Sequence, residues 1–102
     1  MTFTRVAAVE DLWSGELQGF VVDGRKVLLI RSGEVVTAYE DRCAHLGVPL
    51  SKGRLEGDVL TCSAHEWQYD IRSGRGINPA TACLKAYPVK IDQGQVWVDA
   101  NG

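Results

Sequence analysis

The sequence predicts a small all-β protein, a sandwich or barrel built from short strands. From residue 17 to residue 99, apolar residues alternate with polar ones or run in short stretches that end at glycine and polar turns. No segment longer than one turn shows a helical, 3.6-residue apolar period. With 102 residues, 45% of them hydrophobic, the chain suits one compact domain, expected to span residues 1–102.

The first half of the chain predicts a meander. A single helical turn is expected at 9–13. Strands are expected at 17–22, 26–31 and 34–39, because the tight-turn signals Asp23-Gly24 and Ser32-Gly33 separate these segments.

The second half predicts two further pairs of strands. A hairpin-like pair is expected at 59–62 and 67–71, followed by a glycine-rich turn at 73–76. A closing hairpin is expected at 87–91 and 95–98, and it completes the sandwich or barrel. Its alternating pattern predicts one buried face made of Val89, Ile91, Val96 and Val98.

Charge and hydropathy exclude several classes of protein. The 11 basic and 13 acidic residues give the chain no net positive charge of the kind that attracts nucleic acid. The longest apolar run, Val27-Leu28-Leu29-Ile30, fits a buried strand and is far shorter than the roughly 18 residues of a membrane span. The first residues do not resemble a signal peptide, so we expect a protein of the reducing cytoplasm without disulfides.

Two short clusters hold both histidines and two of the three cysteines of the chain. They are Cys43-Ala44-His45 and Cys62-Ser63-Ala64-His65, with 16 residues between them. Each cluster offers one thiolate and one imidazole. Two cysteines on one iron and two histidines on the other form the ligand set of a Rieske-type 2Fe-2S cluster. The pattern therefore predicts Cys43 and Cys62 as ligands of one iron, and His45 and His65 as ligands of its neighbour.

A tetrahedral zinc site is the main alternative, since two cysteines and two histidines also satisfy zinc. Common zinc modules place like ligands together in each half of the site, whereas each half here holds one of each kind. A zinc-binding interaction module would be colourless. Four unrelated residues are a second alternative, which requires both histidines to fall at this spacing by chance.

In the order and spacing of these pairs, the chain resembles Rieske proteins, and among them the small ferredoxins of bacterial oxygenases. The resemblance implies an all-β Rieske iron-sulfur domain, in which a strand-rich base carries a small cluster-binding subdomain at about residues 41–80. More narrowly, Cys62-Ser63-Ala64-His65-Glu66-Trp67 followed by Gly76-Ile77-Asn78-Pro79 resembles the ferredoxin component of toluene and related aromatic diiron monooxygenases.

The resemblance implies an electron-transfer component and not an enzyme. Such a ferredoxin would carry single electrons from an NADH-dependent flavin and iron-sulfur reductase to a diiron hydroxylase that oxidises aromatic hydrocarbons. It would hold one 2Fe-2S cluster and act as a monomer without a nucleic-acid or membrane partner. The ferredoxin of a ring-hydroxylating dioxygenase is the nearest alternative.

Departures from respiratory Rieske proteins indicate the lower-potential branch of the family. Val48 and Ala64 stand where those proteins have a disulfide, and Trp67 stands where they have a serine that donates to a bridging sulfide. Loss of that donor leaves more negative charge on the sulfur and disfavours reduction. Trp67 is expected to pack in the core or to take part in docking, and Pro79 to lie in a loop that shields the cluster.

The remaining residues of interest have structural interpretations. Cys83 has no place in the motif and is expected to be a small buried residue. Trp13 and Trp97 are expected to belong to the scaffold. The basic residues of the middle segment are expected to form a solvated surface; they are Lys52, Arg54, Arg72 and Arg75.

Overall fold

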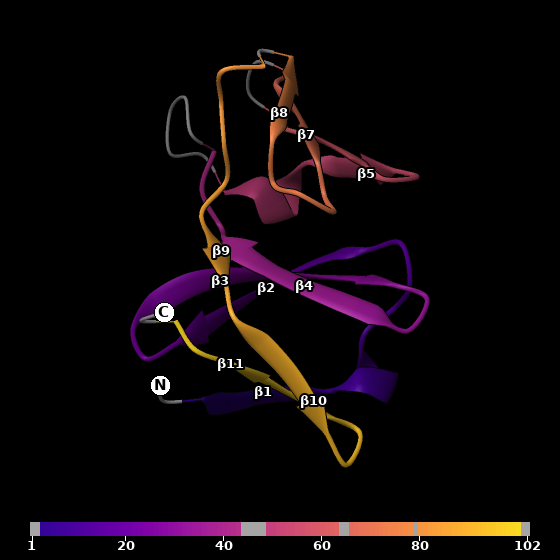
Figure 1. Ribbon diagram of the computed structural model, residues 1–102, viewed down its shortest axis with the longest axis vertical. Helices are drawn as coiled ribbons and strands as arrows, with labels where there is room; N and C mark the ends of the chain where they lie inside the picture. Colours follow the sequence, from indigo (N-terminus) through magenta and orange to yellow (C-terminus); the bar gives the residue numbers. More distant parts are fainter. Residues whose placement is uncertain (1–2, 44–48, 64–65, 79, 101–102) are drawn as a thin grey trace.

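The computed structural model describes residues 3–43, 49–63, 66–78 and 80–100, and over these residues the chain forms three antiparallel sheets in layers (Figure 1). The central sheet has the strand order β2-β3-β4-β9, the first outer sheet β1-β11-β10, and the second outer sheet β5-β6-β7-β8. We call the last of these the upper sheet, after its place in Figure 1. The all-β prediction is confirmed.

The strands are short. The central sheet consists of β2 (Leu17–Val22), β3 (Arg25–Ser32), β4 (Val35–Glu40) and β9 (Ala86–Tyr87). The first outer sheet consists of β1 (Thr4–Ala8), β10 (Val89–Asp92) and β11 (Gln95–Val98). The upper sheet consists of β5 (Arg54–Glu56), β6 (Val59–Thr61), β7 (Gln68–Asp70) and β8 (Gly76–Asn78). Two single 3₁₀ turns are η1 (Val9–Asp11) and η2 (Leu50–Lys52).

Strand β3 separates two hydrophobic cores. Val27 and Leu29 point into the core shared with the first outer sheet, whereas Leu28 and Ile30 point into the core shared with the upper sheet. Successive side chains of a strand point to opposite faces, so a continuous apolar run is the pattern of a strand buried on both sides. All four side chains are at most 1% exposed. The predicted buried strand is therefore the centre of the protein.

The predicted meander and closing hairpin are both present. The bounds of β2 and β11 agree with the prediction, and those of β3 and β4 differ by one residue. Asp23 and Gly24 both have positive φ, 51° and 78°, as the tight β2–β3 turn requires.

Proline divides one predicted strand into two. The segment predicted as a single strand at 87–91 forms β9, which pairs with β4, and β10, which pairs with β11. Pro88 lies between them, and its missing N–H interrupts any ladder at that point. The chain uses this break to pass from the central sheet to the first outer sheet, as the ribbon below β9 shows (Figure 1).

Several short elements were not predicted. Strand β1 pairs with β11 through an irregularity between Arg5 and Ala7, and its sequence lacks clear alternation. Strands β5 and β8 have three residues each and carry mainly exposed side chains, so no apolar period marks them. Tertiary pairing, rather than local propensity, defines these strands.

Two expectations about apolar side chains are wrong. Trp13 is 69% exposed and does not belong to the scaffold core, because it lies in the loop after η1. Ile91 is 46% exposed although its partner Val96 is fully buried, because β10 is an edge strand and Ile91 lies near the hairpin tip. Trp97 is half-buried, and the Lys90 ammonium lies 5.7 Å from its ring centroid.

No helical segment in the described part of the chain has the length and apolar character of a membrane span.

Gly53, at the end of η2, lies where two backbone segments approach each other closely. Its N–H donates to the Leu50 carbonyl at 2.9 Å, and a Cβ at this position would overlap the carbonyl oxygen of Thr61. Gly53→Ala should destabilise the protein by about 2–3 kcal/mol, since overpacking against backbone forces the chain to shift. We expect a fall of about 10 °C or more in the thermal midpoint, followed by circular dichroism.

Gly57→Ala is the matched control for that substitution. Gly57 has a positive φ of 61°, but a Cβ there would meet nothing within 4 Å. Its substitution should cost only the backbone term of about 1 kcal/mol. Equal midpoints for the two variants would show that the contact between Gly53 and Thr61 does not constrain the fold.

Candidate metal centre

The structure brings the two predicted sulfur ligands into one buried cluster of side chains. Cys43 follows β4 by three residues and Cys62 directly follows β6, and their exposed fractions are 2% and 1%. Both belong to the core between the central and upper sheets. The other buried members of this core are Leu28, Ile30, Tyr39, Leu50, Leu60, Tyr69, Ile71 and Leu84. None of the three cysteines forms a disulfide.

The predicted nitrogen ligands, His45 and His65, lie outside the described residues, as does Pro79. Among the residues that the structure does describe, no three potential ligands from His, Cys, Asp and Glu come together. The described half of the candidate centre is therefore the sulfur half, Cys43 and Cys62.

A buried carboxylate connects the two ends of the first cysteine-histidine segment. Asp41 Oδ1 accepts a hydrogen bond from the Ser51 backbone N–H, and Asp41 Oδ2 accepts one from the Ser51 hydroxyl, each at 2.8 Å. Gly19 of β2 allows this arrangement, because a Cβ there would lie 2.9 Å from Asp41 Oδ2. Asp41 precedes Cys43 by two residues, so this pair fixes the chain on both sides of residues 42–50.

The second cysteine-histidine segment is closed by backbone hydrogen bonds. The Cys62 N–H donates to the Trp67 carbonyl at 2.8 Å, and the Glu66 N–H donates to the Cys62 carbonyl at 3.1 Å. Glu66 has a positive φ of 57°, a conformation uncommon for residues other than glycine. The chain thus reverses within six residues, 62–67, and Cys62 lies at the last paired position before the turn.

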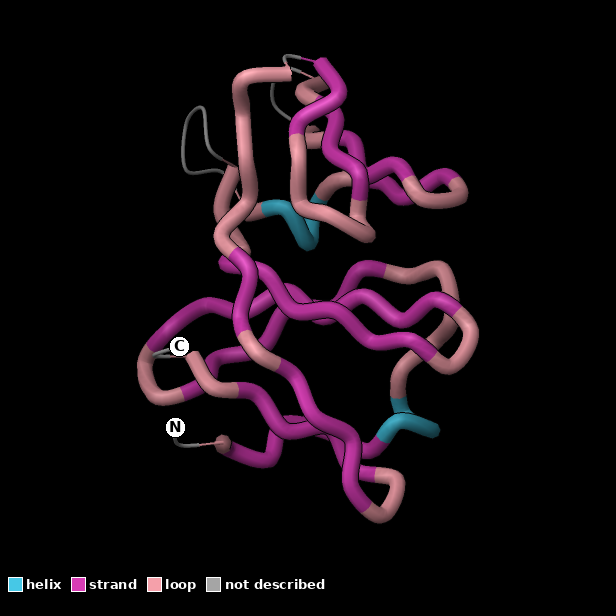
Figure 2. The backbone as a smooth tube through the Cα atoms, viewed as in Figure 1, coloured by secondary structure: helices cyan, strands magenta, loops and turns pink. Residues whose placement is uncertain are grey.

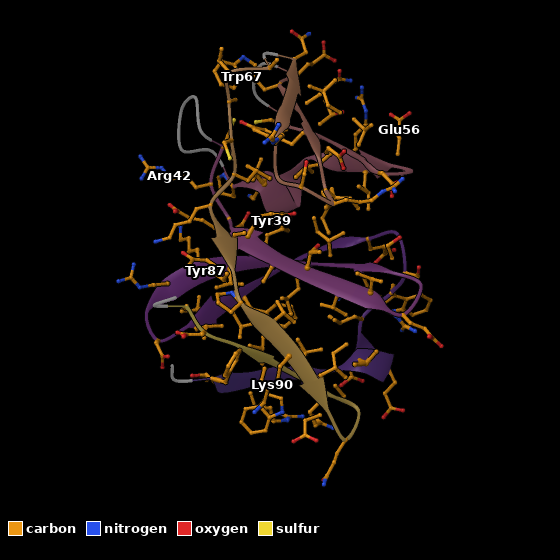
Figure 3. All side chains as sticks on the ribbon, in the orientation of Figure 1. Tyr39, Arg42, Glu56, Trp67, Tyr87 and Lys90 are labelled. Atoms are coloured by element: carbon orange, nitrogen blue, oxygen red, sulfur yellow. The ribbon has the colours of Figure 1, made fainter. Side chains whose placement is uncertain are left out.

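Trp67 packs against the core, the first of the two roles between which the sequence did not decide. It packs against the core that contains both cysteines and remains half-buried rather than fully enclosed. Figure 3 shows it at the end of the molecule farthest from Lys90 and the first outer sheet. An indole in this position can stabilise the core and present a surface to a partner.

Two buried tyrosines belong to the core that contains the sulfur ligands, and one of them, Tyr69, lies beside Cys43. The Tyr69 hydroxyl lies 3.5 Å from Cys43 Sγ, and the Tyr69 side chain is fully buried. The Tyr39 hydroxyl instead donates to the Ile71 carbonyl at 2.6 Å. Burial raises the pKa of Tyr39, and the nearby Asp70 and Cys83 add to this rise, so Tyr39 remains a neutral donor at physiological pH.

Sequence reasoning did not single out Asp41, Ser51 or Tyr69. The hydrogen bonds that involve them connect residues 10 and 26 positions apart, so no local spacing reveals the pairs. The one available signal was an acidic residue two positions before Cys43.

Cys83 is exposed, so the expectation that it is buried is wrong. Its residue pairs with Arg75 in an isolated bridge, and its thiol lies 3.5 Å from the Leu84 carbonyl. The next residue, Leu84, is buried instead. In an extended segment neighbouring side chains point in opposite directions, so burial of Leu84 turns Cys83 outward.

Charged residues around the upper sheet are largely paired. Arg54 lies 2.8 Å from Glu56 and 3.9 Å from Glu66, and Arg72 lies 2.5 Å from Asp58. Arg54 and Glu66 also border a hollow of about 240 Å³ that reaches Cys62. Four basic residues are exposed, as expected for a solvated surface: Lys52, Arg54, Arg72 and Arg75. Arg54 and Arg72 also form ion pairs. Because these pairs are exposed, each contributes little to stability.

The chain from β4 towards Cys43 runs beside the segment before β9, at the junction of the central and upper sheets (Figure 2). Both cysteine-bearing segments thus begin at the core between these sheets. Two thiolates held in this core are soft ligands suited to iron or zinc.

Comparison with known proteins gives one family match. The model of the Rieske [2Fe-2S] domain matches residues 2–88. Among curated proteins, the ferredoxin component of the alkene monooxygenase system of Xanthobacter autotrophicus (strain ATCC BAA-1158 / Py2) is 43% identical over 94% of this chain and 80% of its own length. The ferredoxin component of the naphthalene 1,2-dioxygenase system of Pseudomonas putida is 31% identical over 92% of this chain and 91% of its own.

Solved structures give the same picture. The ferredoxin of carbazole 1,9a-dioxygenase from Nocardioides aromaticivorans IC177 superposes with a TM-score of 0.88 at 30% identity, covering 96% of this chain and 97% of its own. A chain from the complex of reduced oxygenase and oxidised ferredoxin in carbazole 1,9a-dioxygenase gives a TM-score of 0.87 at 30% identity, covering 94% and 91%.

Proposed function

The chain belongs to the Rieske [2Fe-2S] domain family, and on this premise we propose that it is the ferredoxin of a multicomponent monooxygenase, carrying single electrons to a diiron hydroxylase. The similarity to the alkene monooxygenase ferredoxin component carries this proposal, because it is 43% identical and extends over 94% of the chain. The burial of Cys43 and Cys62 in one core is consistent with it.

The ligands in this proposal are Cys43 and Cys62 on one iron, and His45 and His65 on the other. The donor set fits the group: the formal 2+ charge of an oxidised 2Fe-2S core cancels two thiolate charges, which would otherwise be costly in an apolar core. Bound there, the cluster takes up and releases one electron at a time. We place these ligands in a subdomain of about residues 41–80 within a single domain of residues 1–102.

Hydrogen bonds and buried side chains hold the two ligand-bearing segments in place. The Asp41–Ser51 pair fixes the first segment, and the Cys62–Trp67 hydrogen bond fixes the second. Leu50, Leu60 and Tyr69, each fully buried, pack in the same core as the two cysteines. The Tyr69 hydroxyl, facing the thiolate of Cys43, would donate a hydrogen bond to it. Such outer contacts tune the potential of a metal site.

The proposed role as an electron carrier also implies an electron source, a cellular location and an oligomeric state. The electron source is an NADH-dependent reductase with flavin and an iron-sulfur centre, and the chain acts as a cytoplasmic monomer, where NADH is available. We assign Trp67 to the docking surface and Pro79 to shielding of the cluster. Substrate binds the hydroxylase and not this chain, so both an aromatic hydrocarbon and an alkene are compatible with this ferredoxin.

A ring-hydroxylating dioxygenase is the second candidate for the electron acceptor. The naphthalene dioxygenase ferredoxin component and the carbazole dioxygenase ferredoxin both resemble the chain, at 31% and 30% identity. We favour the monooxygenase because identity is higher to the alkene monooxygenase component and because Trp67 and Gly76-Ile77-Asn78-Pro79 follow the monooxygenase pattern. The family match removes the zinc module from consideration.

A reconstituted assay tests the proposed function. The purified holoprotein is combined with an NADH-dependent reductase and a diiron hydroxylase, and products from toluene and from propene are quantified. We expect product formation only when the chain is present, and none with a Cys43→Ala variant. Equal or faster electron delivery to a mononuclear-iron dioxygenase would favour the second candidate instead.

Removal of the Tyr69 hydroxyl should lower the reduction potential. A hydrogen bond to a thiolate offsets negative charge, and its loss makes added electron density less favourable. We expect Tyr69→Phe to lower the potential by about 60 mV, the equivalent of a tenfold change in a one-electron equilibrium constant. Spectroelectrochemical titration of the visible absorption measures the shift.

Tyr39→Phe provides the control for this prediction. It removes a hydroxyl from the same core, but that hydroxyl bonds to the Ile71 carbonyl and not to a cysteine. Its potential should remain that of the wild type while its thermal midpoint falls. Equal shifts in the two variants, or an unchanged potential in Tyr69→Phe, would remove Tyr69 from the tuning of the centre.

A further inference from the structure

Two neighbouring hollows form one depressed face beside the first cysteine-histidine segment. One, of about 320 Å³, lies over the ends of β3 and β4 and reaches Arg42 and Tyr87. The other, of about 300 Å³, lies over β2 and η2 and reaches Val21 and Lys52. Lys26, Asp41 and Pro49 line both, so the two hollows are adjacent.

The charge of this face is opposite to that of the rest of the chain. The basic residues that line the hollows are Arg25, Lys26, Arg42 and Lys52, and a further cation, Lys85, lies 5.4 Å from the Tyr87 ring. We call these five residues and the hollows between them the basic face. Only Glu40 and Asp41 oppose them in its lining. The basic face therefore holds five of the 11 basic residues of the chain but only two of its 13 acidic ones.

Glu40 and Asp41 offset only part of this positive charge, and both oxygens of Asp41 are directed at Ser51. Both carboxylate oxygens of Asp41 accept hydrogen bonds from Ser51, and the residue is buried. Burial raises the pKa of Tyr87, Glu40 adds to the rise and Arg25 opposes it. Lys26, Arg42 and Lys52 are exposed and form no salt bridge with any other described residue.

The basic face also contains an apolar contact surface. Val21 is 73% exposed, the highest value among the large hydrophobic side chains that the structure describes as exposed, and it borders the second hollow with Phe20. Protein interfaces combine an apolar centre with a polar, charged rim. The composition of this face is thus that of a docking surface rather than of a site for a small anion.

The basic face adjoins the candidate metal centre. Arg42 directly precedes Cys43 in the chain, and Pro49 lies at the other end of the same segment. In Figure 3, Arg42 projects into solvent from the flank of the molecule between Trp67 and Tyr87. A partner bound here would lie beside the segment that carries the first ligand pair.

We propose that the basic face docks an acidic surface of the hydroxylase, so that electrostatic attraction brings the partner to the flank next to Cys43. This inference rests on the proposed function, because it specifies the partner of the same electron-transfer site. Complementary charge chiefly increases the association rate and fixes orientation, and salt screens the effect. An acidic partner would be repelled by the rest of this chain, which has an excess of acidic residues, and only the basic face would accept it.

Two double variants with the same charge change test the proposal. Lys26→Gln/Arg42→Gln removes two cations from the basic face. Arg5→Gln/Lys90→Gln removes two cations from β1 and β10 of the first outer sheet. Both holoproteins should keep the absorption and electron paramagnetic resonance spectra of the wild type, which shows that the fold and centre are intact.

The measurement is the second-order rate constant of electron transfer from the dithionite-reduced holoprotein to the diiron hydroxylase, by stopped-flow absorption. Ionic strength is varied from about 0.01 to about 1 M, over which the screening length falls from about 30 to about 3 Å. Ferricyanide, a small anionic oxidant, serves as a second acceptor. For the wild type we expect the rate constant to the hydroxylase to fall as salt rises. The rate constant to ferricyanide should not fall, because the chain and ferricyanide both carry net negative charge.

The basic-face variant should lower the low-salt rate constant to the hydroxylase about tenfold and lose most of its salt dependence. The first-outer-sheet variant should behave as the wild type. The proposal would be overturned if the basic-face variant reduced the hydroxylase as fast as the wild type. It would also be overturned if the variant reacted more slowly with ferricyanide but not with the hydroxylase. A wild type that reduces ferricyanide but no hydroxylase at any ionic strength would refute the proposed function itself, an outcome distinct from the other two.

Discussion

Burial of two cysteine thiols in one apolar core is the constraint on which the rest of the structure depends. Cys43 and Cys62 come from different sheets and are nearly inaccessible to solvent. As thiolates, two such groups would be strongly destabilising in this core without a cation to offset their charge. This core is therefore suited to form the wall of a metal centre.

The central and upper sheets enclose this core from its two sides. Leu28 and Ile30 of strand β3 point into the core that contains the cysteines, and Val27 and Leu29 point into the other core. The central sheet is therefore packed on both faces. Above it, the Asp41–Ser51 pair and the reversal at 62–67 fix the two cysteine-bearing segments independently. The first outer sheet takes no part in this arrangement. It covers the face of the central sheet that lies opposite the cysteines.

Local patterns in the sequence predicted the elements that local chemistry specifies. The β2–β3 turn and the bounds of β2 follow from Asp23-Gly24 and apolar alternation. The cysteine-histidine pairs predict the ligand types, and this remains a prediction. Long-range contacts were not predictable in this way. Tyr69 meets Cys43 across 26 residues, and the pairing of Asp41 with Ser51 depends on the space left by Gly19. The prediction for Cys83 failed because burial of its neighbour Leu84 determines which way it points.

We propose that two histidines and two cysteines of this chain bind one 2Fe-2S cluster. Pulsed electron paramagnetic resonance of the dithionite-reduced protein tests this ligation most directly. We predict a signal of low average g whose spin-echo modulation contains couplings to two histidine nitrogens, from His45 and His65, in a sample with about two irons and two sulfides per chain. A signal without nitrogen coupling would contradict the histidine ligation. A colourless, silent protein with one zinc would contradict the electron-transfer account as a whole.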